Sequence, residues 1–149
     1  MSLRPANIMP KSTNAQDVLQ QAYLDAHYIV DTEPPFTLFI GQVCRPLATL
    51  YLAHDVDCCA YLTAYNPRSQ RLDTALNVQR QCALMHDVQK IGRGVIEGRS
   101  LCPDGAWPTE LSVLALGIKG HVARELGRKY EQNAIVLAGP AAIPELVWL

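Results

Sequence analysis

The chain has 149 residues, of which 49% are hydrophobic and 18% are charged, and its formal net charge at pH 7 is −1. This balance is typical of a single globular domain with its own hydrophobic core and excludes extensive disorder. Proteins that hold duplex nucleic acid through its phosphates are usually more basic, so the charge argues against that role.

Polar, proline-broken residues open the chain, and we expect a flexible N-terminal arm at residues 1–14 followed by a single domain at 15–149. Asn14 or Ser12 is a suitable N-cap for the first helix. Pro46 stands where a proline fits the first turn of a helix. In chain order, the first half predicts a helix at 15–28, a strand at 36–40, a helix at 47–54 and a strand at 58–65.

The second half continues this alternation. Asp73 is the expected N-cap of a long amphipathic helix, and Pro103-Asp104-Gly105 is a strong turn signal within a loop at 98–109. The expected elements are a helix at 74–90, strands at 91–97 and 111–118, a helix at 120–131 and a strand at 133–137.

These elements predict an α/β fold: a mixed sheet of about five strands with helices packed on it. Strands joined through a helix are expected to pair in parallel. The consecutive strands at 91–97 and 111–118 can instead form an antiparallel hairpin.

Five cysteines, an odd number with no C-x-x-C spacing, indicate reduced thiols rather than a disulfide framework or a zinc ribbon. The chain has no signal-peptide core and no apolar stretch that approaches the roughly 18 residues of a membrane span. We therefore expect a cytoplasmic protein without a membrane segment.

Several unusual blocks follow one another in a specific order. They are Phe36–Gln42, Leu62–Ser69, Asn77-x-x-Arg80, Asp104-Gly-x-Trp-Pro-x-Glu110, Leu114–Ile118 and Tyr130-x-Gln-Asn-Ala-Ile135. With these blocks the chain resembles, over nearly its whole length, a bacterial family known as domain of unknown function 3293. One departure is Glu131, where the family pattern leads us to expect glycine. The resemblance implies a compact cytoplasmic α/β fold, and it carries over no activity and no catalytic residue.

Polar residues stand at the end of the strand predicted at 58–65. Because ligands of α/β proteins tend to bind beyond the carboxyl ends of strands, Asn66 and Arg68 are candidate ligand-binding residues, with the Ser69 hydroxyl beside them. Arg68 could grip an anion through two parallel hydrogen bonds. The alternative is architectural: Pro67 holds Asn66 extended, and the amide shapes the turn.

Other candidates surround this point. Asn77 and Arg80 share a helix face, where Arg80 could contact the same ligand or pair internally with a carboxylate. Trp107 could stack on a base or sugar, or fix its loop to the core. Glu97 and Gln132 complete the predicted site if their strand ends lie beside Asn66.

Three carboxylates, Glu97, Asp104 and Glu110, bracket the loop at 98–109 and could hold Mg²⁺ or act as general acid and base. This pattern leaves a metal-dependent hydrolase or nuclease as an alternative function. Nothing in the spacing requires a metal, and we assign neither a metal ligand nor a cofactor.

The main hypothesis from the sequence is a domain that binds an anionic small molecule or a nucleotide at the strand-end polar cluster. A different class of function is a non-enzymatic interaction module, such as a homodimer. This alternative rests on the apolar segment Ile143–Leu149, which has no evident partner in the sequence.

Overall fold

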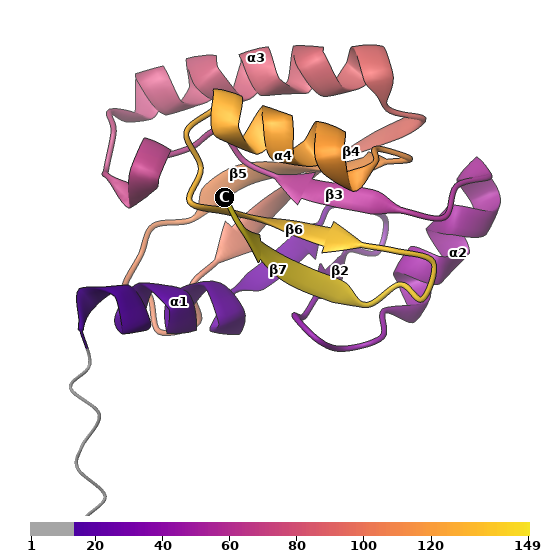
Figure 1. Cartoon of the computed structure of the whole chain (residues 1–149), viewed down its shortest axis with the longest axis horizontal. Coiled ribbons are helices and arrows are strands. Elements are labelled where there is room, and N and C mark those ends of the chain that lie inside the picture. Colours follow the sequence, from indigo (N-terminus) through magenta and orange to yellow (C-terminus); the bar gives the residue numbers. More distant parts are fainter. Residues whose placement is uncertain (1–13) are drawn as a thin grey trace, which may run out of the picture.

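The computed structural model describes residues 14–149, in which four α-helices and seven strands are found (Figure 1). Of the predicted arm, residues 1–13, including Ser12, lie outside the described residues. The helices are α1 (Ala15–Asp25), α2 (Arg45–His54), α3 (Thr74–Ile91) and α4 (Gly120–Lys129). The strands are β1 (His27–Val30), β2 (Phe36–Leu38), β3 (Cys59–Leu62), β4 (Gly94–Leu101), β5 (Glu110–Leu116), β6 (Ala134–Ala138) and β7 (Pro144–Trp148). A short 3-10 turn, η1 (Pro67–Ser69), follows β3.

The strands form one sheet in the order β2-β1-β4-β5-β3-β6-β7, and every neighbouring pair is antiparallel. The prediction of an α/β protein is confirmed, and so is the antiparallel hairpin, which is β4–β5. The predictions of about five strands and of a mixed sheet are wrong.

The connections explain the second error. Strands that flank a helix do run in the same direction, but they are never neighbours. β5 lies between β3 and β4, which flank α3, and β3 lies between β5 and β6, which flank α4. The connections through α3 and α4 therefore each skip one strand position, which an antiparallel strand occupies, and the connection through α2 from β2 to β3 skips three positions.

Local capping determines where the helices begin. The side chain of Asn14 accepts a hydrogen bond from the amide of Asp17 at 2.8 Å, and Asp73 accepts one from Ala75, so both predicted N-caps are confirmed. The first helix is shorter than the predicted 15–28 because Ala26 adopts extended dihedral angles. The β-branched and aromatic residues His27–Val30 then form β1, a strand that the helical pattern had hidden.

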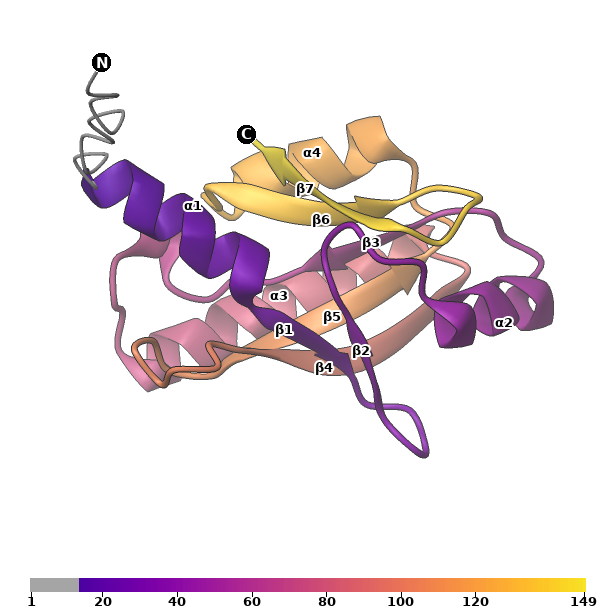
Figure 2. The ribbon, with the colours of Figure 1, turned by 90° about the horizontal axis from the view of Figure 1, so that it is seen from below.

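The sheet is covered on both faces. α3 and α4 pack on one side, whereas α1 and α2 lie towards the opposite side, near its two ends (Figures 1 and 2). Alternate residues of each central strand enter different cores, as in β3, where Tyr61 joins the core with α2 and Leu62 joins the core with α3 and α4. This explains why β3 is buried at every position.

The C-terminal segment does have a partner within the chain. Pro144–Trp148 is the edge strand β7, paired with β6 in the register Ala134↔Trp148 to Ala138↔Pro144. The observation that motivated a homodimer is therefore removed, and the homodimer itself stays an untested prediction. Within residues 14–149, no helix has the combination of length and apolar character that a membrane crossing requires.

Candidate functional site

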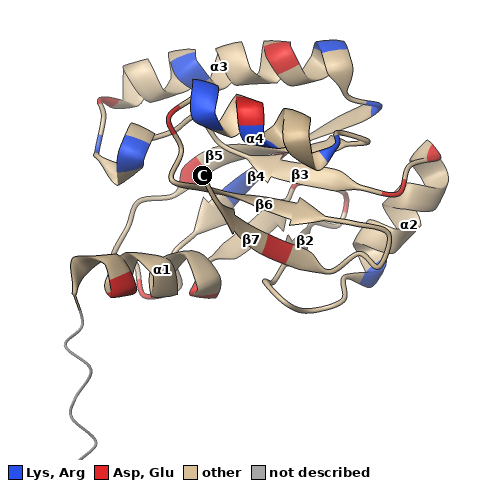
Figure 3. Ribbon diagram, in the orientation of Figure 1, with Lys and Arg blue, Asp and Glu red and all other residues tan. Residues whose placement is uncertain are grey.

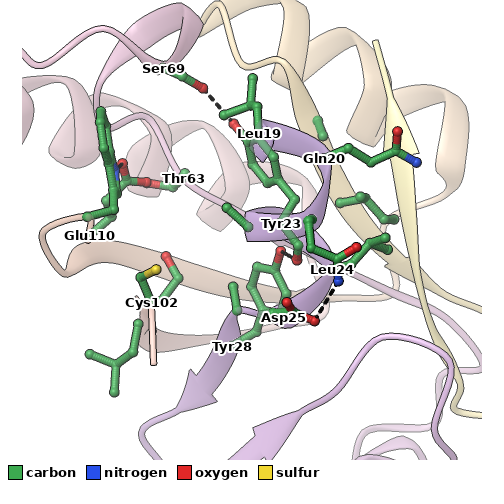
Figure 4. Close-up of a pocket in the computed structure, with 18 of the residues that line it drawn as sticks. Leu19, Gln20, Tyr23, Leu24, Asp25, Tyr28, Thr63, Ser69, Cys102 and Glu110 are labelled. Carbon is green, nitrogen blue, oxygen red and sulfur yellow. Dashed lines mark hydrogen bonds between the residues drawn. The ribbon is translucent and has the colours of Figure 1, made fainter. Parts of the chain in front are cut away.

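A cleft of about 980 Å³ opens between α1 and the sheet face opposite α3 and α4. Its walls come from α1, the strands β1, β3, β4, β5, β6 and β7, the turn after β3, and the loop between β4 and β5. Figure 4 shows Tyr23 reaching from α1 towards Ser69, with Thr63, Glu110 and Cys102 on the facing side. A cleft of this size is typical of small-molecule sites.

The turn after β3 is built around Asn66. This residue is 5% exposed and adopts a left-handed conformation, with φ 46°. Asn77 Oδ1 accepts from the Asn66 amide at 2.8 Å, and Asn66 Oδ1 accepts from the Leu72 amide at 2.9 Å. Arg68 and Ser69 also have positive φ angles, 55° and 57°. Three of the four residues at positions 66–69 are thus non-glycine residues in the left-handed region of φ/ψ space. This conformation is strained, and the hydrogen bonds of the turn must offset its cost.

Two side chains of α3 satisfy the backbone of Ala64 just before this turn. Gln81 Oε1 accepts from the Ala64 amide at 2.8 Å, and Arg80 Nε donates to the Ala64 carbonyl at 3.0 Å. Arg80 also donates from Nη2 to the Tyr130 carbonyl at 2.6 Å. The Gln132 side chain then donates to the Tyr65 carbonyl at 3.0 Å. Because buried backbone groups need partners, these three side chains support the end of β3, with Arg80 and Gln81 behind the cleft and Gln132 in its lining.

Glu110, the first residue of β5, presents a carboxylate to the cleft. Its Oε1 accepts hydrogen bonds from Trp107 Nε1 at 2.7 Å and from Asn66 Nδ2 at 2.9 Å. Burial raises the pKa of this carboxyl, and the two hydrogen bonds lower it in part. Among the described residues, no hydrogen bond or ion pair engages Oε2. That oxygen is available to a ligand.

Tyr23 connects α1 to the opposite wall. Its hydroxyl lies 2.9 Å from Ser69 Oγ, which also accepts from Asn133 Nδ2 at 2.9 Å. Burial raises the pKa of the Tyr23 phenol. The Tyr28 hydroxyl donates to the Tyr23 carbonyl, and the Tyr23 ring meets the Trp148 ring edge-to-face at 5.3 Å. No residue of α1 is buried, so these contacts around Tyr23 position the helix over the cleft.

Comparison with known families decides which group the chain falls into. The model of the family described as protein of unknown function (DUF3293) matches residues 62–135. The chain belongs to the DUF3293 family. No curated protein and no solved structure matches it. In this DUF3293 protein the matched region runs from the end of β3 into β6 and contains Asn66, Arg80 and Glu110, whereas α1 and Tyr23 lie before it.

The structure places the predicted site residues in three different environments. Asn66, Trp107 and Gln132 line the cleft, whereas Asn77 and Arg80 support it through the hydrogen bonds of the turn. Arg68 is exposed and does not line the cleft.

Glu97 lies on the other face of the sheet. It pairs with Val113, whose side chain joins the core with α3 and α4, and partners directly opposite point to the same face. The predictions that Arg68 and Glu97 belong to one site with Asn66 are therefore corrected. A position near a strand end in the sequence does not determine which face of the sheet a residue occupies.

The three carboxylates considered for a metal are not brought together. Asp104 accepts from Cys102 Sγ at 2.8 Å and from the Ala106 amide at 2.9 Å, which is the role of a turn residue. Glu110 faces the cleft and Glu97 the opposite face of the sheet. In residues 14–149, no group of three or more His, Cys, Asp or Glu side chains could hold a metal ion.

The aromatic side of the cleft was not evident from the sequence. Tyr23, Tyr28, Tyr61 and Tyr65 all line it, and the first two stand in a segment that was predicted to be one continuous helix. Tyr28 lies on β1 and contacts Tyr61 on β3 with ring centroids 5.5 Å apart. The one signal in the sequence that could have revealed these tyrosines is the strand pattern of His27–Val30.

Proposed function

We propose that this protein binds a small molecule in the cleft between α1 and the sheet. The single observation that carries the proposal is the Glu110 carboxylate, which is held at Oε1 by Trp107 and Asn66 inside a cleft of about 980 Å³ with aromatic walls. Small-molecule sites commonly combine a mostly apolar lining with a few fixed polar groups. The rigid turn behind Glu110 supplies the fixed geometry that such recognition needs.

The identity of the polar groups changes the expected ligand. An anionic molecule or nucleotide was expected because of Arg68 and Arg80, but Arg68 lies outside the cleft and Arg80 is bound to two backbone carbonyls. The lining of the cleft gives that expectation no support.

A screen by thermal shift tests the proposal. The library should include aromatic amines, amino acids, nucleotides and sugar phosphates. A ligand at a hundredfold excess over Kd stabilises the folded state by roughly 2.7 kcal/mol, which is enough to shift the midpoint by several degrees.

A matched pair of variants locates the binding. Ser100 and Arg99 are neighbours on β4, and only Ser100 lines the cleft. Ser100→Trp should fill part of the cleft and abolish the shift caused by a hit, whereas Arg99→Trp should leave it unchanged. A hit that survives Ser100→Trp, or a library without any hit, would contradict the proposal.

We also propose a cytoplasmic location. The support is that Cys44, Cys58, Cys59, Cys82 and Cys102 are all free thiols, as expected in a reducing compartment. Alkylation in intact cells, followed by mass spectrometry without a reducing step, should find no disulfide among the five. A disulfide in that experiment would contradict the proposal.

A further inference from the structure

The charges around the cleft all have one sign. Among the residues that the structure describes, its lining contains four carboxylates and no lysine or arginine. Figure 3 shows that the charged residues of α1 are all acidic, whereas α3 and α4 carry charges of both signs. The acidic lining residues are Asp17, Asp25, Asp104 and Glu110. Three of them are solvent-exposed and are screened by water, so Glu110 is the carboxylate whose charge acts most strongly in the cleft.

Glu110 has no counter-ion within the described chain. The two salt bridges found there join Arg99 to Asp31 and Lys129 to Asp87. Both hydrogen-bond donors to Glu110 are neutral groups, the indole of Trp107 and the amide of Asn66. A carboxylate that is largely removed from water without an opposite charge is costly, and the raised pKa of Glu110 has the same cause. A cation in the cleft would remove that cost.

One arginine, Arg71, lies near the loop between β4 and β5, but it contacts Trp107 and not Glu110. The guanidinium of Arg71 stands over the Trp107 ring at 5.3 Å from the ring centroid. It forms no ion pair with Glu110 and does not line the cleft. The contact also shows that one face of the Trp107 indole already carries a cation.

Aromatic rings supply a second attraction for positive charge. Tyr23 reaches the cleft from α1 and Tyr28 from β1 (Figure 4). Tyr65 also lines the cleft, and Trp107 lines it beside Glu110, to which its indole donates a hydrogen bond. The face of an aromatic ring attracts an ammonium or guanidinium group, and the attraction grows when the cation is desolvated. Rings and carboxylate together form the kind of surroundings that bind organic cations.

We infer that the ligand carries a positively charged nitrogen, an ammonium or guanidinium group, that pairs with Oε2 of Glu110, while its apolar part lies among the tyrosines. This inference rests on the proposed function, because it specifies the chemistry of the same cleft. The carboxylate recognises the charge of the ligand, and the aromatic side chains contact its apolar part.

Three probes of one shape and different charge test the inference. Tryptamine is cationic at pH 7, 3-ethylindole is neutral and indole-3-propionate is anionic. Calorimetry on the full chain should show tryptamine binding at least about tenfold more tightly than the other two. In Glu110→Gln, which keeps the size and the Oε1 acceptor, tryptamine should bind no better than the neutral probe. The exposed carboxylate Glu97 on the opposite face provides the control Glu97→Gln, which should retain the full preference.

The outcomes separate the inference from the proposed function. Equal binding of tryptamine and 3-ethylindole, or tighter binding of indole-3-propionate, overturns the inference of a cationic ligand. The proposal that the cleft binds a small molecule then still stands. A preference that persists in Glu110→Gln also overturns it. Absence of tryptamine binding at millimolar concentration overturns it as well, and the Ser100→Trp screen then decides independently whether the cleft binds any small molecule.

Discussion

Asn66 and Asn77 hold each other through two reciprocal hydrogen bonds. Asn77 Oδ1 accepts a hydrogen bond from the backbone amide of Asn66, and Asn77 Nδ2 donates one to Asn66 Oδ1, both at 2.8 Å. This pairing leaves Asn66 Nδ2 directed at Glu110, to which it donates at 2.9 Å. The turn after β3, the first turns of α3 and the carboxylate of the cleft are thus one connected network.

The network predicts strong coupling between the two asparagines. Asn66→Ala should lower the free energy of unfolding by about 2–4 kcal/mol, because it removes three hydrogen bonds of a left-handed residue. Asn77→Ala should cost about 1–3 kcal/mol. A double-mutant cycle by urea unfolding should give a coupling of about 1 kcal/mol or more. Gln79→Ala, on the exposed side of α3, is the control and should change stability by less than about 0.5 kcal/mol.

The burial of Glu110 predicts a specific pH dependence. The pKa of Glu110 in the folded state is raised above its ordinary value of 4.5. At a pH between 4.5 and the folded-state pKa, the folded protein therefore binds more protons than the unfolded chain. Stability from this group is therefore present at low pH and lost as the pH rises through the folded pKa.

Glu110→Gln isolates the effect. The free energy of unfolding of the wild type minus that of the variant should be largest below pH 4.5 and should fall as the pH rises, until it reaches a plateau. Urea unfolding of both proteins between acidic and neutral pH gives this difference, in which the other titrating groups cancel. A difference that increases with pH would show that Glu110 is stabilised in its charged form.

Glu131 predicts a stabilising substitution. It follows the C-cap of α4 with φ 58°, the left-handed conformation that usually favours glycine at this position. The glycine expected from the family pattern is replaced, yet the turn is kept. Glu131→Gly should therefore raise the free energy of unfolding by about 0.5–1 kcal/mol. Glu131→Val should lower it, and a loss of stability in the glycine variant would contradict the explanation.

Gly98 predicts the opposite behaviour, because a side chain there has no room. A Cβ at this position would collide with the backbone carbonyl of Ile29 and approach the Tyr61 hydroxyl to 2.8 Å. These two groups bond each other at 2.7 Å. Gly98→Ala should cost about 2–3 kcal/mol in chemical denaturation. Gly139, where an added Cβ meets nothing within 4 Å, provides the control Gly139→Ala, which should be nearly neutral.

Periodicity and capping were sufficient to predict most elements of the fold. The strands β2 to β6 and the helices α2 to α4 were expected within a few residues of their bounds, because their patterns are local. The order of strands was not accessible in the same way, since it depends on which strands occupy the positions that the helical connections skip. β1 and β7 were missed because each is short and adjoins a segment with another pattern.

The candidate site shows a similar division. The sequence grouped Asn66, Asn77 and Arg80 as ligand-binding candidates. The structure brings the three together at the turn after β3, where Asn77 and Arg80 form hydrogen bonds with the turn and do not line the cleft. The side chain geometry that orients Glu110 into the cleft, and keeps Arg68 and Glu97 out of it, depends on the sheet register and on the left-handed turn. Neither can be read from residue spacing.

Within residues 14–149, the helix over the cleft has few stabilising contacts apart from those around Tyr23. Segments with few buried contacts open at a lower free energy than the whole domain unfolds, and their amides exchange with deuterium accordingly. The amides of α1 should therefore exchange much earlier than those of β3 or β5. A ligand seated beneath the helix would slow exchange in α1 first, so deuterium uptake at residues 15–25 reports occupancy of the cleft before any change in global stability is measurable.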